Sequence, residues 1–205
     1  MTPLRLVLAR HGQTTANSQH ILDTRLPGHP LTEAGHQQAV DLAQRLADEA
    51  VVAVYASRAV RARQTAQPIA ARHQLTVQIL DGVHEVFIGD LEGCRTPEDH
   101  HTLHELYRTW HYGDLEASRP GGESGKQVLE RYLADVAAIR RAHWGGGTAV
   151  LVSHGAATRL AVVALAANVE GSFAAPRLLP NAATVLLEAD GTGWRCLRWD
   201  GIELG

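Results

Sequence analysis

Cysteine is scarce in this 205-residue chain, with only Cys94 and Cys196 present. Two cysteines do not make the disulfide framework of a small secreted domain, and these two lack the spacing of a metal knuckle. The first apolar run is interrupted by Arg5 and ended by Arg10, unlike the apolar part of a signal peptide. We therefore expect a cytoplasmic protein.

A strong charge excess and long apolar runs are also missing. Lys and Arg number 19 against 22 Asp and Glu, and neither sign gathers in a tail or stripe. Nucleic acid is therefore not an expected partner. No apolar stretch approaches the ~18 residues that a membrane span needs, so no membrane contact is expected either.

Short apolar runs alternate instead with amphipathic stretches. With 45% hydrophobic residues, the chain is the right size for one domain with a substantial core. We expect strands over 4–9, 51–56, 75–80 and 148–153, and helices after Thr32 and over 59–72, 124–143 and 156–167. Residues 182–189 and 194–199 predict an antiparallel hairpin at the sheet edge. Four of its apolar residues offer a contact for a homodimer, namely Val185, Leu186, Leu187 and Trp194.

Two segments do not fit this alternation. Residues 18–30 predict a loop that folds over the site, and Pro68 is expected to kink or divide the helix that contains it. Residues 94–122 predict one or two helices, inserted as a cap into a single domain of residues 1–205. The aromatic residues of this cap either wall a substrate pocket or attach the cap to the body; they are Tyr107, Trp110 and Tyr112.

The cap also holds a histidine cluster, formed by His100, His101, His104 and His111. His100 and His104 share a helix face, as zinc ligands would. No other donors converge with them at a convincing spacing. We therefore expect a solvated or substrate-facing surface and no metal.

Two strand-to-helix junctions carry the same pattern. The run 4–9 leads into Arg10, His11 and Gly12, and the run 148–153 leads into His154 and Gly155. In an open α/β sheet, ligands collect where strands end at their carboxyl edge. Glycine allows a tight turn there, and the helix start beyond Gly12 offers unpaired N–H groups to an anion. The pattern predicts two imidazoles at one sheet edge, inside an anion site.

Four sequence blocks resemble the signature blocks of the histidine phosphatase superfamily, in its phosphoglycerate-mutase-like branch. They are 10–14 (RHGQT), 57–65 with Arg61, 85–93 beginning at Glu85, and 153–155 (SHG). The blocks occur in the expected order and span nearly the whole chain. The resemblance implies an α/β fold: a three-layer α/β/α sandwich whose mostly parallel sheet has an antiparallel edge strand, with a small helical cap over the site. It implies no cofactor.

The same residues have the chemistry for phosphoryl transfer, and the resemblance implies the same roles. A neutral His11 can attack phosphorus and form a phosphohistidine. Arg10 and Arg61 disfavour its protonation and bind phosphoryl oxygens, while His154 donates to an equatorial oxygen. Glu85 protonates the leaving alkoxide and then deprotonates the attacking water. The resemblance further suggests phosphate or substrate contacts from three residues, Thr14, Asn17 and Gly155.

Two positions qualify the resemblance. Arg58 and Ala59 stand where the family often has a proline and a leucine after the serine of the second block. Arg58 is either an extra phosphate ligand or a surface charge, and we favour the surface. Glu92 is expected to be a structural hydrogen-bonding residue and not a second acid.

Three functions are compatible with these residues: a phosphomonoesterase acting on a small-molecule ester, a cofactor-dependent phosphoglycerate mutase, and a non-catalytic phospho-ligand binding protein. Every chemical role is filled, which disfavours the third. Mutases of the family are typically longer, with a basic run in the cap and a C-terminal tail that excludes water. Here Arg95, Arg108 and Arg119 are scattered among acids, and the chain ends soon after the hairpin. We therefore favour hydrolysis, while the ester itself stays open.

Overall fold

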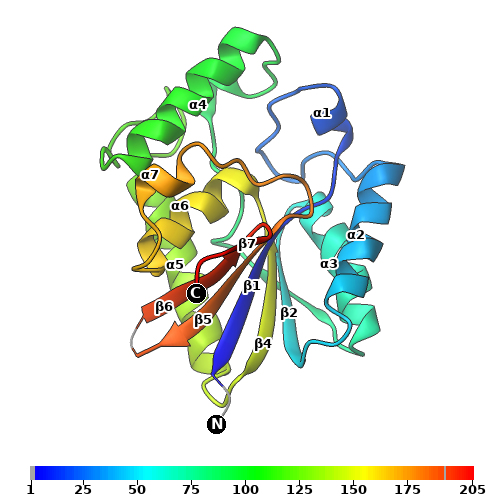
Figure 1. Ribbon diagram of the computed structural model, residues 1–205. Helices are drawn as coiled ribbons and strands as arrows, with labels where there is room; N and C mark the ends of the chain where they lie inside the picture. The colour runs from blue at the N-terminus through cyan, green and yellow to red at the C-terminus, as the bar shows by residue number, and fades with distance from the viewer. Residues whose placement is uncertain (1–2, 192) are drawn as a thin grey trace.

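The computed structural model describes residues 3–191 and 193–205, which form a mixed sheet with helices on both faces (Figure 1). The seven strands of this part of the chain lie in the order β3-β2-β4-β1-β5-β6-β7. Their bounds are β1 (Leu4–Arg10), β2 (Val51–Ser57), β3 (Val77–Leu80), β4 (Gly147–Ser153), β5 (Thr184–Asp190), β6 (Gly193–Trp199) and β7 (Ile202–Glu203).

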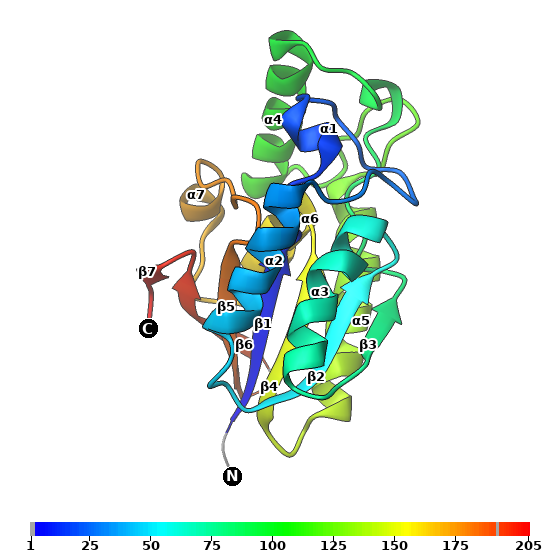
Figure 2. The ribbon, with the colours of Figure 1, turned by 90° about the vertical axis from the view of Figure 1, so that its right-hand side faces the viewer.

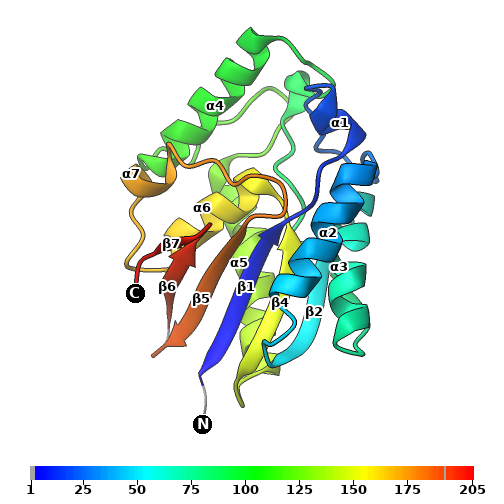
Figure 3. The same cartoon turned by 45° about the vertical axis from the view of Figure 1, so that its right-hand side comes forward.

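The sheet has a parallel half and an antiparallel half. Strands β3, β2, β4 and β1 are mutually parallel, whereas β5, β6 and β7 each pair antiparallel to the preceding neighbour (Figure 3). The predicted α/β fold with an antiparallel edge is confirmed. The outermost strand is β7 and not the predicted hairpin, because the short β7 adds to the free edge of β6.

The helices are α1 (Thr15–Ser18), α2 (Glu33–Arg45), α3 (Val60–Arg72), α4 (Pro97–His111), α5 (Gly125–Ala142), α6 (Gly155–Leu165) and α7 (Gly171–Ala174), with a 3₁₀ turn over Gly89–Leu91. The predicted cap Thr32 accepts a hydrogen bond from the Gly35 N–H and starts α2. Among the described residues, none of the helices has the length and apolar character to cross a bilayer.

Alternating strand residues divide the core between the two faces of the sheet. Val7, Val54 and Val150 pack in one cluster with residues of α2 and α3, and Leu6 and Leu151 pack in the other with residues of α5 and α6. Figure 2 shows α2 and α3 covering one face, with α5 behind the sheet. The result is the three-layer sandwich that we expected.

Pro68 does not divide its helix, which excludes one of the two outcomes that we predicted. Helix α3 runs from Val60 to Arg72 with Pro68 inside it. A proline within a helix costs ~3 kcal/mol. The buried inner face of α3, formed by Ala62, Ala66, Ile69 and Ala70, packs against the sheet and offsets this cost.

The cap segment, residues 94–122, lies beyond the carboxyl ends of the parallel strands and contains the single helix α4 (Figures 1 and 2). Its aromatic residues differ in position. Trp110 is buried in the core cluster that includes residues of α5 and α6, so it attaches the cap to the body, and its indole N–H donates to the Ala117 carbonyl within the cap at 2.9 Å. Tyr112 is 62% exposed, so it neither walls a pocket nor attaches the cap to the body.

The hairpin β5–β6 is present but offers no dimer contact through the residues that we named. Val185, Leu187 and Trp194 are buried in the chain's own core, and Leu186 packs against the cluster beneath α2 and α3. These strands pack into the core because β5 pairs with β1 and is not an edge strand. The homodimer stays a prediction without support from these side chains.

Candidate active site

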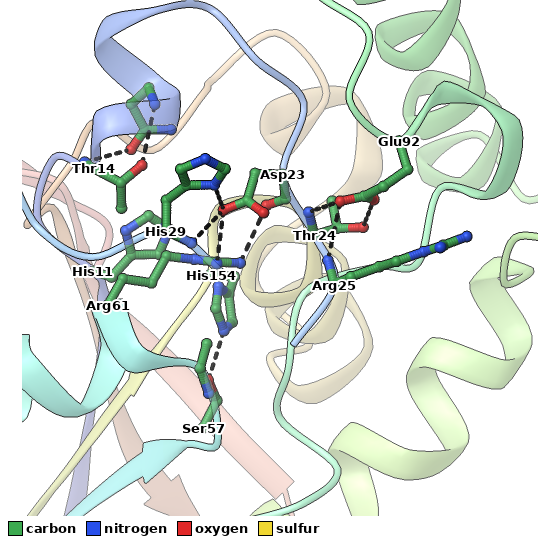
Figure 4. A network of polar contacts seen from close by, with 12 residues as sticks. His11, Thr14, Asp23, Thr24, Arg25, His29, Ser57, Arg61, Glu92 and His154 are labelled. Atoms are coloured by element: carbon green, nitrogen blue, oxygen red, sulfur yellow. Dashed lines mark hydrogen bonds and ion pairs between the residues drawn. The ribbon is translucent and has the colours of Figure 1, made fainter. Parts of the chain in front are cut away.

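The two junctions with histidine lie side by side. Strands β1 and β4 are parallel neighbours, and Arg10 pairs with Ser153 at their ends. His11 and His154 therefore leave the sheet together, with ring centroids 5.2 Å apart and ring planes at 62°. Both are buried (Figure 4). This confirms that the two imidazoles share one edge of the sheet.

The tautomer of His11 follows from its backbone contact. Its Nδ1 lies 2.7 Å from the Gly12 carbonyl oxygen, which can only accept a hydrogen bond. Nδ1 therefore carries the proton, and Nε2 keeps its lone pair. Burial, followed by the charges of Arg61 and Arg10, holds the pKa of His11 well below its usual range. The ring is neutral at physiological pH.

Residue 12 must be glycine because the backbone of α2 passes very close to it. A Cβ at this position would lie 2.5 Å from the carbonyl oxygen of Gly35 in α2, so no other residue fits without backbone movement. The Gly12 N–H donates to the Thr65 hydroxyl of α3 at 3.0 Å. These contacts fix the turn that carries His11 between α2 and α3.

His154 is oriented by the adjacent strand. Its Nε2 lies 2.7 Å from the hydroxyl oxygen of Ser57, at the end of β2. Its Nδ1 is buried and has no hydrogen-bond partner among the described residues. Burial, then the charges of Arg61 and of His11, lower the pKa of His154 well below its usual range. A neutral ring with one unpartnered nitrogen is left for a ligand.

Two guanidinium groups flank the imidazoles. Arg10 donates through Nη1 to the Leu179 carbonyl at 2.6 Å, while its buried Nε has no partner among the described residues. Arg61 is 2% exposed and contacts the carboxylate and the carbonyl oxygen of Asp23, each at 3.3 Å (Figure 4). Burial is the main cause that lowers the pKa of each arginine. Two cations therefore meet at one buried point.

The loop 18–30 covers this point, as predicted. Asp23 accepts from Arg61 and also from the His29 backbone N–H at 2.9 Å. The carboxylate of Glu92 accepts from Thr24 and Arg25, which confirms its structural role. The loop thus supplies the carboxylate partner of Arg61, a contact that the sequence pattern did not reveal.

Glu85 lies at the start of α6, next to the second junction. Its carboxylate accepts from the backbone N–H groups of Ala156 at 3.2 Å and Ala157 at 3.0 Å. A helix N-terminus stabilises negative charge in this position. Glu85 is therefore held at the edge of the pocket beside Gly155.

A second charged pair fixes the backbone that carries Glu85. The guanidinium of Arg131, from α5, donates to the carbonyl oxygens of His84 at 2.8 Å and Glu85 at 3.2 Å. It also binds Glu123 with an N–O distance of 2.7 Å, and both side chains are mostly buried. Glu123 in turn accepts from the Phe87 N–H. Arg131 thus ties the loop of Glu85 to α5.

The helix start beyond Gly12 does not offer free N–H groups, contrary to our expectation. The Thr15 N–H donates to the Pro30 carbonyl, and the Asn17 N–H donates to the Thr14 hydroxyl. These groups are satisfied because Thr14 and Asn17 form a reciprocal cap at the four-residue helix α1. Any anion at this edge must be bound mainly by side chains.

The three suggested contact residues differ in position. Thr14 is 1% exposed and caps α1, so it positions Asn17 and does not line the pocket. The amide oxygen of Asn17 accepts from the Thr14 N–H and from Asn181, which turns its amide nitrogen toward the pocket. Gly155 lines the pocket beside Arg10, where an added Cβ would lie 3.3 Å from the arginine Nε.

A pocket of about 400 Å³ lies between the sheet edge and the cap. Arg10, His11, Arg61 and Glu85 line its inner end, and Gly155 lines it next to His154, which is not itself a lining residue. Its outer wall comes from four segments, with His20, Ile21, Leu22, His100, Leu103, His104, Tyr107, Arg159, Leu178, Leu179 and Asn181. Tyr107 therefore walls the pocket and is also part of the core.

Sequence reasoning missed Asp23, Asn181 and Arg159 as pocket residues. Arg159 did carry a signal, because it is the only charged residue in a helix that is otherwise apolar nearly all round. Such a side chain is buried only at a cost, which marks it for a partner or a ligand. Asp23 and Asn181 lie in irregular loops, where no periodic pattern locates them.

The sequence left two interpretations open for Arg58 and two for the histidine cluster of the cap. Arg58 is exposed and pairs with Asp81 at 3.5 Å, which confirms the surface position. His100 makes a hydrogen-bond contact of 2.8 Å with the His20 carbonyl oxygen. Within residues 3–191 and 193–205, no three His, Cys, Asp or Glu side chains come together as a metal site requires.

Comparisons with known proteins match this geometry. A solved mycobacterial glucosyl-3-phosphoglycerate phosphatase superposes with a TM-score of 0.83 at 27% identity, over 97% of this chain and 99% of its own. Another structure of that protein is a complex with inorganic phosphate. Phosphoserine phosphatase 1 of Hydrogenobacter thermophilus is 32% identical over 155 residues, which cover 74% of this chain and 71% of that protein.

Longer relatives also match. A bifunctional protein of Mycobacterium tuberculosis is 35% identical over 161 residues, covering 75% of this chain. The chain spans 42% of that protein and 36% of a second mycobacterial relative. Residues 6–201 match the histidine phosphatase superfamily (branch 1). The chain belongs to this superfamily.

Proposed function

We propose that the protein is a phosphomonoesterase that hydrolyses a small-molecule phosphate ester through a phosphohistidine on His11. The observation that carries this proposal is the pair of buried, neutral imidazoles 5.2 Å apart, with two arginines beside them at the floor of a pocket. We further propose that residues 1–205 act as one domain, in which the cap segment covers the catalytic end.

The phosphate dianion binds between the positive groups. Arg10 has a buried Nε without a partner, and His154 has a buried Nδ1 without one, among the described residues. Arg61 brings a second guanidinium to the same point. Donors fixed before the reaction stabilise the charge that develops on the phosphoryl oxygens, usually the largest catalytic effect. These groups supply the positive charge that a metal would otherwise bring, so the proposal includes no metal and no cofactor.

In the first step, Nε2 of His11 attacks phosphorus and the P–O bond to the leaving alcohol breaks. The electron pair of that bond passes to the alkoxide oxygen, which takes a proton from the Glu85 carboxylic acid. The products are phosphohistidine, the free alcohol and the Glu85 carboxylate. The Nδ1–H contact with the Gly12 carbonyl holds the ring throughout.

In the second step, water attacks the phosphohistidine. The Glu85 carboxylate takes one proton from this water, and the P–N bond breaks with its electron pair returning to Nε2. Inorganic phosphate leaves and His11 is again neutral. The same carboxyl group thus acts as acid in one half of the reaction and as base in the other.

The relatives support this proposal. Two of them are phosphatases by name, acting on phosphoserine and on glucosyl-3-phosphoglycerate, and one has been obtained with inorganic phosphate bound. Because the chain spans less than half of some relatives, the activity of the whole protein in its setting is part of the proposal.

The test is a phosphate-release screen over a panel of metabolite esters, run with and without EDTA and with His11→Ala as the blank. We expect release from at least one ester, independent of EDTA and abolished by the substitution. Release that stops in EDTA would contradict the metal-independent chemistry. Faster conversion of 3-phosphoglycerate to 2-phosphoglycerate than release of phosphate would show the mutase instead.

A further inference from the structure

Arg159 is a buried cation without a carboxylate partner. It lies in α6, is 4% exposed and lines the pocket. Its Nη2 donates to the Ala174 and Ala175 carbonyls, whereas its buried Nε has no partner among the described residues. Burial lowers the pKa of Arg159. A desolvated guanidinium without a counter-charge is costly unless a ligand supplies one.

The three guanidiniums of the pocket differ in their partners. Arg61 is paired with Asp23 at 3.3 Å. Within the described residues, no ion pair joins a carboxylate to Arg10 or to Arg159. The phosphate of the substrate accounts for Arg10 under the proposed function. Arg159 is then the one cation of the pocket that neither the protein nor the phosphate has neutralised.

Its place in the helix separates it from the phosphate end. Arg159 follows Gly155 by four residues, which is slightly more than one turn, or ~6 Å along α6. Arg159 is anchored through Nη2 at the carbonyls of Ala174 and Ala175, at the end of α7. It borders a second hollow together with His104, Tyr107 and Leu178, all of which also line the main pocket. The pocket thus continues past the phosphate end to Arg159.

We propose that Arg159 binds a carboxylate on the leaving group of the substrate. This inference rests on the proposed function and names its substrate class: phosphate esters of small hydroxy acids, with the carboxylate about one helical turn from the phosphorus. A guanidinium presents paired N–H donors that match the two oxygens of a carboxylate. Leu103, Tyr107 and Leu178 bound the space around the short carbon chain.

A second phosphate fits this position less well. A phosphate brings nearly two negative charges, and among the described residues Arg159 is the only arginine or lysine of the outer wall. Arg108 lines the adjoining hollow but is already paired with Glu105. His104, at the rim, has a pKa lowered by partial burial and by the charges of His100 and Arg159, so its ring is neutral. A carboxylate brings one negative charge, which balances the one positive charge of Arg159. We therefore place a carboxylate here.

The test compares matched esters that differ by the carboxylate alone. O-phosphoserine is paired with O-phosphoethanolamine, and 3-phosphoglycerate with glycerol 3-phosphate. For at least one pair, we expect the wild-type kcat/KM to favour the carboxylate-bearing ester by about 10–100-fold, the contribution of a hydrogen bond to a charged group. Arg159→Met should bring that ratio close to one, and Arg159→Lys should retain part of it.

A matched control separates this role from a structural one. Arg177 also donates to a carbonyl of the same segment, that of Phe173, but it does not line the pocket. Arg177→Met should leave the ratio at the wild-type value. Thermal unfolding of each variant reports any loss of folding. If Arg159→Met does not fold, Arg159→Lys decides the question, and a ratio in Arg159→Lys equal to the wild-type ratio would overturn the inference.

The outcomes distinguish the two proposals. No phosphate release from any ester, with or without a carboxylate, would overturn the proposed function. Release without preference for the carboxylate in either pair would overturn this inference alone. So would equal loss of both esters of a pair in Arg159→Met, since Arg159 would then act at the phosphate or on the fold. A preference for glycerol 1,3-bisphosphate, which has a second phosphate and no carboxylate, over 3-phosphoglycerate would show that Arg159 binds a phosphate and would overturn the inference.

Discussion

The two ends of the pocket are built differently. At the sheet edge, each side chain is held by a neighbour: His11 by the Gly12 carbonyl, His154 by Ser57, and Arg61 by Asp23. At the cap end, the wall comes from α4 and from loops, and His104 at the rim is exposed. The first end is a set of fixed, buried charges and rings, whereas the second is a surface of mixed polarity.

This difference separates chemistry from selection. Transition-state charge is stabilised well only by groups that need no rearrangement during the reaction, which strands and helix starts can provide. Recognition of the leaving group requires only complementary contacts, which a cap and loops can supply. Substitutions at the sheet edge should therefore reduce the rate of every ester, and substitutions at the cap should change which ester reacts.

The largest effect within this comparison is expected for Glu85→Gln. Loss of a positioned acid and base should slow hydrolysis of alkyl phosphates by about 10²–10⁴-fold. With an aryl ester of low leaving-group pKa, the first step needs no proton and should be slowed far less. A pre-steady-state burst of the phenol measures that step. Equal losses for the two esters would show that Glu85 does not protonate the leaving group.

Arg131→Gln tests whether the sheet-edge residues act through their supports. Loss of the contacts to the His84 and Glu85 carbonyls should displace Glu85, and such a displacement can cost about 10²-fold. The loss should show the same leaving-group dependence as Glu85→Gln. Arg108→Gln, which breaks the exposed pair with Glu105 and the contact with the Tyr112 ring, is the control. A uniform loss for alkyl and aryl esters would indicate damage to the fold instead.

The buried histidines should make the sheet edge sensitive to acid. His154 takes up a proton near pH 6.5 when unfolded, but its folded pKa lies well below that value. The folded state therefore loses up to ~1.4 kcal/mol for each pH unit below 6.5. Urea unfolding at pH 7.0 and 5.5 should show a smaller loss in His154→Gln than in wild type. The exposed His101→Gln should behave as wild type.

A second buried histidine, His111, should also contribute to the pH dependence of stability. Burial, with the charge of Arg159, lowers the pKa of His111 to about 4. Its contribution to stability is complete above pH 6.5 and decreases as the pH falls toward 4. His111→Gln should therefore also flatten the pH dependence of unfolding. An unchanged slope in both variants would mean that these rings are already protonated in the folded state.

The smallest effect is expected for His100→Ala in the cap. The side chain of His100 contacts the His20 carbonyl and the edge of the His104 ring, and a partly exposed substitution of this kind changes stability by about 0.5 kcal/mol or less. The burst rate with an aryl ester should remain within about 2-fold of wild type, as that energy implies. A loss as large as that of Glu85→Gln would place the cap in the chemistry and break the comparison.

The sequence predicted the sheet edge because local pattern determines it. An apolar run followed by histidine and glycine places the ring at a strand end, and parallel pairing then brings His11 and His154 together. The predicted positions of Glu92 and Arg58 were confirmed for the same reason, as each lies within a matching block. The division of the helix at Pro68 and the free N–H groups at α1 were predicted wrongly, because tertiary packing and side-chain caps decide them.

The cap end could not be predicted in this way. Asp23 and Asn181 reach the pocket from loops that are distant in sequence, and their positions depend on contacts with Arg61, Asn17 and the His11 carbonyl. Val185 and Leu187 looked like a free edge because the pairing of β5 with β1 leaves no local signal. Long-range contacts of this kind determine substrate selection, which is why the ester stayed open.

The most direct test of the account is to trap the phosphoenzyme. A burst reaction of Glu85→Gln with an aryl phosphate is quenched in alkali, where phosphohistidine survives, and the digested protein is mapped by mass spectrometry. We predict one phosphate per chain, on His11, and none in the same experiment with His11→Ala. Phosphate on another residue, or turnover that persists in His11→Ala, would contradict the account.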